Sequence, residues 1–430
     1  MADILATPLK LPCGATLPNR LAKAAMTEGL AAPQGRATAE LDRLYAVWSD
    51  GGAGMLLSGN IQIDRDHLER PGNVIIDREP DEQAKQALAH WAATATRGGN
   101  HFWAQISHAG RQTQKPVNAN PKAPSAVKLG LPGGQFGLPV PLTDDEILNL
   151  IGRFATAARV CKEAGFTGVQ IHAAHGYLLS QFLSPLANRR DDRWGGSLEN
   201  RARMLLFVIN SVRTVVGPDF PISVKLNSAD FQKGGFAFEE SLQVAKWLQD
   251  ASVDLIEISG GTYEQPRLLG IEGMEAPEEQ NVAASTIARE AYFVDFAKAM
   301  RAEISIPLMV TGGFRSRSAM RQALESGAAD LIGLGRPLCY FPDGAKRLLG
   351  GMEMLPRKEN ELALFPSSLQ WLTRFKMLRA IDSFAGQYWF YSQLYALGKT
   401  GRPAPERTVF QAFREVESAH KVWLKNRARG

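Results

Sequence analysis

The chain has 430 residues, of which 45% are hydrophobic and 22% charged, with a net charge of +5. Its Lys and Arg are spread among Asp and Glu, so no nucleic-acid-binding surface is indicated. No apolar run reaches the roughly 18 residues that span a bilayer. The N-terminus also lacks a basic region followed by an apolar run, so we expect no membrane segment, no secretion signal and a cytoplasmic location.

Eight short apolar runs recur along the chain, each followed by a longer helical pattern. Several are apolar for three or more residues in a row, which is typical of parallel strands buried on both faces. The runs lie at 20–26, 53–59, 101–107, 167–173, 221–227, 253–259, 306–312 and 329–335. Eight strand–helix units predict an α/β fold, a closed (β/α)₈ TIM barrel over residues 1–350. An open doubly wound sheet is the alternative, but no Gly-x-Gly-x-x-Gly follows any run.

Helix ends and loops carry their own signals. Thr143 and Glu146 form a capping-box pattern, and Ser197 is placed to cap a second helix. Two long loops, 108–142 and 260–290, follow strands and should lie on the C-terminal face of a barrel as lids or binding loops. From residue 351 to 430 the chain is rich in aromatic residues in a helical pattern. This C-terminal helical extension is expected to pack on the barrel or on a neighbouring subunit, which leaves a homo-oligomer open.

Polar residues and glycines follow the predicted strands where each one ends. Because all strand ends of a parallel barrel meet at one mouth, these residues should converge there. They are Thr27 (preceded by Met26), Gly59, Asn60, Gln105, His108, His172, His175, Tyr177, Lys225, Asn227, Gly312, Gly313, Gly335 and Arg336. The glycines of the last two strands let backbone N–H groups approach an anion, and Arg336 adds a charge-assisted contact. A phosphate-bearing ligand is therefore expected at that side of the mouth.

His172 and His175 admit two interpretations. As metal ligands they would need a third, such as His108, and the protein would be a metal-dependent TIM-barrel hydrolase. However, the three cysteines are isolated and no carboxylate follows the eighth strand, so we expect no metal site. As a pair of donors they would aim at one substrate oxygen on which negative charge develops. Tyr177 would then be a candidate proton donor.

Several stretches resemble the Old Yellow Enzyme family of FMN-dependent NADH:flavin oxidoreductases and ene-reductases. They are LPNRLAKAAMT, QISHAGRQ, GFTGVQIHAAHGYLLSQFLSPLANRRDDRWGGSLENR, VTGGF and IGLGRPL, and the resemblance covers residues 1 to about 345. It implies a barrel that holds FMN noncovalently at its C-terminal mouth. It further implies reduction by NADH or NADPH and a small electron-poor substrate, an alkene activated by a carbonyl or nitro group.

The resemblance also implies roles for single residues. Thr27 matches a side chain near the flavin O4/N5 edge, with its hydroxyl donating toward O4, and Gln105 matches the amide that reads the pyrimidine ring. Lys225 falls near N1/O2, where many members have Arg. His172 and His175 match the pair that holds the substrate's oxygen, and Tyr177 matches the usual proton donor. The full set expected at the cofactor is Ala25, Met26, Thr27, Gly59, Asn60, Gln105, Lys225, Gly312, Gly313, Phe314, Gly335 and Arg336.

Three positions around the end of the first strand depart from the family pattern. Ala25 stands where a proline is common. Members of one subclass have Cys at the position of Thr27 and an aromatic residue near Gly29, and this chain has neither.

Overall fold

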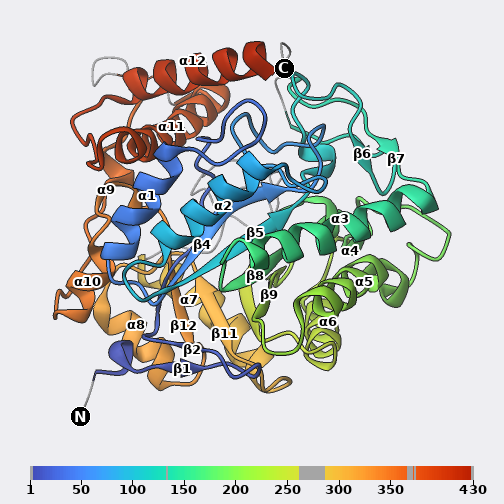
Figure 1. The fold of residues 1–430 in the computed structure, drawn as a ribbon, viewed down its shortest axis with the longest axis horizontal. Coiled ribbons are helices and arrows are strands. Elements are labelled where there is room, and N and C mark those ends of the chain that lie inside the picture. Colours follow the sequence, from blue (N-terminus) through green and yellow to red (C-terminus); the bar gives the residue numbers. More distant parts are fainter. Residues whose placement is uncertain (1–2, 132–133, 261–285, 366–370, 372–373, 428–430) are drawn as a thin grey trace.

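Eight parallel strands form a closed barrel in the computed structural model, which describes residues 3–131, 134–260, 286–365, 371 and 374–427 (Figure 1). Their order is β10-β11-β12-β3-β4-β5-β8-β9, and β9 pairs with β10 to close the ring. The strands are β3 (Leu21–Lys23), β4 (Met55–Gln62), β5 (His101–Ser107), β8 (Gly168–Ala173), β9 (Ile222–Asn227), β10 (Leu255–Ser259), β11 (Leu308–Thr311) and β12 (Leu331–Leu334). The predicted TIM barrel is confirmed, and the open doubly wound sheet is wrong.

Helices surround the barrel, one or more after each strand. They are α1 (Ala39–Asp50), α2 (Glu82–Ala95), α3 (Asp144–Glu163), α4 (Leu178–Leu183), α5 (Leu198–Val216), α6 (Phe238–Asp250), α7 (Thr286–Arg301), α8 (Arg317–Glu325), α9 (Pro337–Tyr340) and α10 (Gly344–Leu349). The capping box of Thr143 and Glu146 is present at the start of α3, and Ser197 caps α5. Each cap satisfies backbone N–H groups that the first helical turn leaves unpaired.

A two-stranded hairpin closes the N-terminal end of the barrel. In it β1 (Leu9–Lys10) pairs antiparallel with β2 (Thr16–Leu17). Leu9, Leu11 and Leu17 pack against the part of the barrel interior nearest the strand N-termini, which contains Met55 and Trp103. Water is thereby excluded from this end, so the opposite end, where the strands terminate, is the one available to a ligand.

The C-terminal extension consists mainly of α11 (Lys376–Thr400) and α12 (Val409–Arg427), which lie together at the top of Figure 1 near α1. The hydrophobic core of the barrel continues into α11 through Trp389, Leu394 and Leu397. Trp423 of α12 donates its indole N–H to the carbonyl of Ala31, at 2.9 Å, in the loop after β3. The extension therefore packs on the barrel of its own chain.

Two long loops are expected after β5 and β10, and the one after β5 lies on the mouth side of the barrel. The first contains a 3₁₀ turn (Gly110–Gln112) and a small sheet of β6 (Lys122–Ala123) and β7 (Val140–Pro141). Most of the second, predicted at 260–290, lies outside the described residues. Within the described ranges, no helix has both the length and the apolar character needed to cross a membrane.

Candidate active site

His172, His175 and Tyr177 lie together at the end of β8. The ring centroid of His172 is 5.1 Å from that of His175 and 4.7 Å from that of Tyr177. His172 and Tyr177 are almost completely buried, with 3% and 4% of their surface exposed. The structure thus brings together the three residues that the sequence predicts as catalytic.

His172 is held in one tautomer. Its Nδ1 accepts a hydrogen bond from the backbone N–H of Ala174 at 3.2 Å. Burial, followed by the charges of His175 and Lys225, places the pKa of His172 well below its usual value. A neutral imidazole that accepts at Nδ1 must carry its proton on Nε2. His172 therefore offers an N–H donor at Nε2 across the neutral pH range.

His175 occupies a strained backbone position. Its φ of 60° lies in the left-handed region, which costs a non-glycine residue roughly 1–3 kcal/mol. Its backbone N–H donates to Asn227 Oδ1 at 3.1 Å, and its carbonyl accepts from Gln112 Nε2 at 3.1 Å. Its ring Nε2 lies 2.6 Å from Ser259 Oγ at the end of β10. Side chains from three neighbouring segments thus fix where the imidazole points, and burial again lowers its pKa well below the usual value.

A chain of polar side chains crosses the barrel interior beside these histidines. Gln105 Nε2 donates to Gln170 Oε1 at 2.7 Å, and Gln170 Nε2 donates to Glu257 Oε2 at 2.9 Å. Glu257 Oε1 in turn accepts from Lys225 Nζ at 2.8 Å. All four are at most 5% exposed. Gln170 and Glu257 were missed from the sequence, although each interrupts an otherwise apolar strand.

Thr27 and Asn60, from the ends of β3 and β4, share one carboxylate. Thr27 Oγ1 donates to Glu69 Oε2 at 2.6 Å, and Asn60 Nδ2 donates to the same oxygen at 2.8 Å. The sequence expectation was that the Thr27 hydroxyl would donate to a flavin, so this hydrogen bond differs from it. Glu69 was not predicted because it lies in an irregular loop, away from any strand end.

Gly59 has a structural reason to be glycine. A Cβ at this position would lie 2.1 Å from Glu28 Oε2 and 2.6 Å from the carbonyl of Met26. Its N–H donates to Glu28 Oε1 at 2.7 Å. Glu28 also accepts from the hydroxyl of Tyr45, which accepts from Lys23 Nζ. This buried polar cluster packs behind the mouth and supports the ends of β3 and β4.

The ends of β11 and β12 carry the predicted glycines. Gly312 and Gly313 have φ values of 126° and 77°, where other residues are strained. Gly335 has no such φ, and a Cβ there would meet no atom closer than Met26 Sδ at 4.0 Å. Neither the backbone conformation nor the neighbouring atoms therefore require glycine at position 335. A ligand lying close to the backbone would require it.

Two guanidinium groups adjoin these glycines. Arg336 Nε lies 3.6 Å from Glu359 Oε1, and Arg315 Nη2 pairs with the same oxygen. Arg315 also donates from Nη1 to the carbonyl of Phe314 at 2.8 Å. Burial would raise the pKa of Glu359, but the two arginines outweigh it and lower that pKa. Arg315 and Glu359 were not predicted, because neither directly follows a strand end.

Ala25 and Met26, the last two positions predicted to contact the cofactor, follow the end of β3. Ala25 and Met26 are both partly exposed, in the segment that links the strand to Thr27. Met26 Sδ is 3.5 Å from Cys339 Sγ of α9. The side chain of Met26 thus joins the end of the first barrel strand to the helix that follows the last one.

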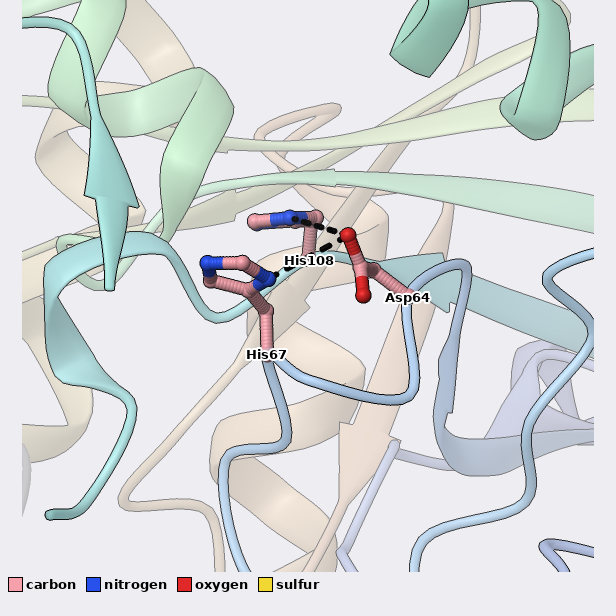
Figure 2. A group of neighbouring side chains, drawn as sticks. All are labelled: Asp64, His67 and His108. Carbon is pink, nitrogen blue, oxygen red and sulfur yellow. Dashed lines mark ion pairs between the residues drawn. The ribbon is translucent and has the colours of Figure 1, made fainter. Parts of the chain in front are cut away.

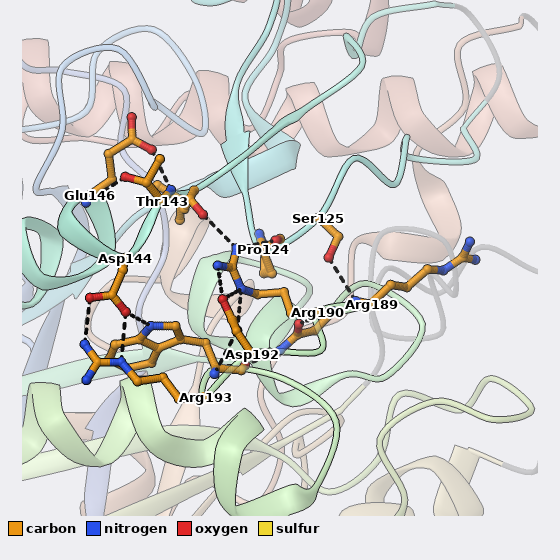
Figure 3. Close-up of polar contacts among 12 residues, drawn as sticks. Pro124, Ser125, Thr143, Asp144, Glu146, Arg189, Arg190, Asp192 and Arg193 are labelled. Carbon is orange, nitrogen blue, oxygen red and sulfur yellow. Dashed lines mark hydrogen bonds and ion pairs between the residues drawn. The ribbon is translucent and has the colours of Figure 1, made fainter.

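Much of the longest motif is structural. Arg190 donates from Nη1 to the carbonyls of Leu142, at 2.7 Å, and Pro124, at 3.0 Å (Figure 3). Trp194 Nε1 donates to Asp144 Oδ1 at 2.6 Å, and Arg193 pairs with the same carboxylate. This part of the motif holds the loop after β5 against the start of α3, so it shapes the mouth without entering it.

A separate group of potential metal ligands consists of Asp64, His67 and His108 (Figure 2). Asp64 Oδ2 faces His67 Nδ1 at 3.2 Å and His108 Nε2 at 3.7 Å. The other ring nitrogens already accept backbone hydrogen bonds, from Lys122 N to His67 and from Gly110 N to His108. Both imidazole protons must therefore point at Asp64.

A metal ion in this group would need lone pairs where those protons are. If the protons moved to the other ring nitrogens, each imidazole N–H would face the backbone N–H that now donates to it. Arg153 Nη1 also lies 3.3 Å from Asp64 and supplies a positive charge there. Burial, with the charge of His67, lowers the pKa of His108 to about 4, so the ring is neutral at pH 7. The group therefore fits a structural role. Because it also contains neither His172 nor His175, the hydrolase interpretation finds no support among the described residues.

Residues 5–354 match the model of the NADH:flavin oxidoreductase / NADH oxidase family. The chain belongs to this family. An NADH-dependent flavin oxidoreductase of Talaromyces variabilis is 36% identical over 421 residues, covering 94% of this chain and all of the relative. An NADH oxidase of Thermoanaerobacter brockii is 33% identical, but this chain spans only half of its length.

Solved structures agree with this assignment. An old yellow enzyme homologue of Zymomonas mobilis matches 84% of this chain and 97% of its own, with a TM-score of 0.67 and 25% identity. A 2-naphthoyl-CoA reductase gives a TM-score of 0.73 at 26% identity, and covers 82% of this chain and 53% of its own. The protein is thus an oxidoreductase of the Old Yellow Enzyme family with the family's TIM barrel.

Proposed function

We propose that this protein binds FMN at the barrel mouth, accepts hydride from NAD(P)H and reduces an electron-poor alkene. The observation that carries the proposal is the donor group at the end of β8. His172 offers an Nε2–H in a fixed tautomer, and His175 and Tyr177 lie beside it. One NAD(P)H and one proton would be consumed for each C=C bond reduced.

The residues at the mouth fit FMN. Gln105 and Lys225 supply an amide and a cation for a polar ring edge, and they are the two ends of the interior chain that runs through Gln170 and Glu257. At β11 and β12, Gly312, Gly313 and Gly335 have no side chain to keep a ligand from the backbone, and Arg315 and Arg336 add positive charge suited to a phosphate. When bound, FMN supplies the two-electron chemistry by accepting a hydride and passing it on.

The protein residues supply orientation and protons. His172, through Nε2–H, and His175, through Nδ1–H with Ser259 donating to its Nε2, would hold the carbonyl or nitro oxygen of the substrate and stabilise the negative charge that develops there. Both imidazoles are neutral at pH 7, so they would act as hydrogen-bond donors and leave proton delivery to another group. Tyr177 would deliver the proton to the alkene carbon.

Cofactor binding tests the first part of this proposal. The purified protein should be yellow and release FMN on denaturation. Arg336→Ala should weaken FMN binding by about 1.5–3 kcal/mol, the usual contribution of a charge-assisted hydrogen bond, and should affect riboflavin little. Fluorescence titration of both ligands measures this. A colourless protein that does not take up FMN would refute the proposal.

Turnover tests the second part. Under anaerobic conditions, a panel of unsaturated carbonyl and nitro compounds should support NADH or NADPH oxidation, with the saturated product detected by mass spectrometry. Flavin reduction without reduction of any alkene would limit the activity to NAD(P)H oxidation. Metal analysis with a visible spectrum separates both results from a metal-dependent hydrolase.

A further inference from the structure

Glu69 is a buried carboxylate at the catalytic mouth with no role in the proposed reaction. It lies in the loop after β4 and is 8% exposed, while Thr27 in front of it is partly exposed. One of its oxygens accepts both from Thr27 Oγ1, at 2.6 Å, and from Asn60 Nδ2, at 2.8 Å. Asn60 Nδ2 is also 3.4 Å from Thr27 Oγ1.

This arrangement fixes what Thr27 can offer to a ligand. A threonine hydroxyl has one hydrogen and two acceptor lone pairs. Its hydrogen is directed to Glu69, so the lone pairs are what Thr27 can turn toward a ligand at the mouth. A carboxylate oxygen cannot donate, so the hydroxyl hydrogen of Thr27 stays directed at Glu69.

The C-terminal extension surrounds the residue next to Glu69. The guanidinium of Arg70 lies 3.7 Å above the ring of Tyr391 of α11 and donates to His420 Nε2 of α12 at 2.9 Å. Arg70 has no acceptor atom, so His420 must accept this bond. Burial, followed by the charge of Arg70, lowers the pKa of His420 to about 3, which keeps the imidazole neutral. The extension thus holds a buried cation directly after Glu69 in the chain, and the charge of Glu69 acts on it.

We propose that Glu69 is a positioning residue that directs the Thr27 hydroxyl hydrogen away from the flavin. Its carboxylate also places a negative charge beside the flavin's reacting edge. The inference rests on the proposed FMN site, with Thr27 near O4 and N5. Thr27 then presents lone pairs to the flavin, and its hydrogen is withheld from O4. The C-terminal extension contributes to this arrangement by holding the positive charge of Arg70, the residue that follows Glu69 in the chain.

Replacement of Glu69 by Gln tests the proposal. The amide introduced by this change can donate to Thr27 Oγ1, which frees the hydroxyl hydrogen to donate to the flavin. The variant also lacks the negative charge of Glu69, which disfavours reduction of the flavin. Glu69→Gln should therefore tighten binding of reduced FMN relative to oxidised FMN at least about tenfold. For a two-electron couple, tenfold equals a midpoint potential about 30 mV more positive. Dye equilibration measures the potential of the holoenzyme.

A matched control and a double-mutant test show whether the shift in potential arises from Glu69 and acts through Thr27. Glu415→Gln removes a carboxylate that pairs with Arg407 and Lys399 within the extension, and it should leave the potential unchanged. The shift caused by Glu69→Gln should be smaller when Thr27 is replaced by Val, because part of it acts through the hydroxyl. Full additivity of the two changes would show that Glu69 does not position Thr27.

A vibrational measurement does not depend on the Glu69 variant folding. With Glu69 present, Thr27→Val should leave the flavin C4=O stretching band in place, because the hydroxyl does not donate to O4. A band that moves to higher wavenumber in Thr27→Val would overturn the inference. Failure of the wild-type protein to bind FMN would instead refute the proposed function. FMN binding with equal potentials in wild type and Glu69→Gln would refute only the role of Glu69.

Discussion

His172 and Tyr177 pack against each other, but in the proposed function they act on different atoms of the substrate. The imidazole of His172 is fixed as an Nε2–H donor by the backbone of Ala174, whereas the hydroxyl of Tyr177 lies at the far end of its ring. Donation to an oxygen strengthens as negative charge develops, while proton transfer acts on a carbon. The two side chains should therefore affect different steps.

Replacement of each residue should separate these steps. His172→Ala should slow alkene reduction by about 2.7–4 kcal/mol, if it behaves as an oxyanion-hole donor, and should also weaken phenolate ligands. Tyr177→Phe should spare phenolate binding and flavin reduction by NAD(P)H, but should slow the oxidative half-reaction by about 10²–10⁴-fold. Stopped-flow measurements of the two half-reactions test this.

Tyr388→Phe is a control for loss of a tyrosine hydroxyl outside the site. Tyr388 of α11 donates to Glu417 of α12, at 2.9 Å, so its loss should leave both half-reactions unchanged. If Tyr177→Phe slows both half-reactions equally, Tyr177 orients the ligand and the proton comes from another source.

At the scale of elements, the extension is tied to the loops that form the mouth. Trp423 of α12 bonds to Ala31 in the loop after β3, and Arg427 bonds to Arg65 and Asp66 in the loop after β4. Arg43 of α1 donates to the carbonyl of Gly398 in α11. These contacts join the extension to the first two barrel units, so a cut at residue 350 would remove support from the mouth. The division into domains 1–350 and 351–430 stays a prediction.

His420→Ala should reveal this coupling. The change leaves Arg70 Nη2 without its acceptor, which should lower the free energy of unfolding by about 1–3 kcal/mol. His420→Gln can supply an amide oxygen as acceptor and should restore part of the loss. Urea unfolding followed by far-UV circular dichroism measures both variants. Equal stabilities of His420→Ala and wild type would contradict the contact.

For the whole molecule, buried histidines set the response to acid. Burial is the first cause that lowers the pKa of His172 and His175 well below 6.5, of His108 to about 4 and of His420 to about 3. Each folded-state pKa lies below the unfolded value of about 6.5, so the unfolded chain binds protons first. Stability should therefore be constant above about pH 6.5 and fall as pH decreases below it.

The size of this effect can be measured. Between pH 6.5 and pH 5, each histidine that stays neutral in the folded protein should cost about 2 kcal/mol of unfolding free energy. Urea unfolding at pH 5, 6 and 7.5 gives the slope, and His420→Gln should reduce it by one such contribution. A wild-type stability that does not change between pH 7.5 and pH 5 would show that the histidines are protonated without penalty.

The sequence by itself determined the barrel and most of the residues at its mouth. Apolar runs, the Thr143–Glu146 capping box and the glycines after the last two strands are local signals, because strand burial, helix starts and tight turns depend on nearby residues. In a parallel barrel all strand ends meet, so a residue such as His172 or Lys225 could be assigned to the mouth once eight strands were recognised. The family resemblance then gave those positions their expected roles.

Only the tertiary structure decided how the charged groups of the site are paired. Glu69 lies 42 residues from Thr27, Glu257 lies 32 residues from Lys225, and Glu359 lies 44 residues from Arg315. A buried polar group must find a partner, but which partner it finds depends on the segments that packing brings next to it. Strand periodicity and turn chemistry contain no information on such distant neighbours. The direction of the Thr27 hydroxyl could therefore be read only from the folded chain.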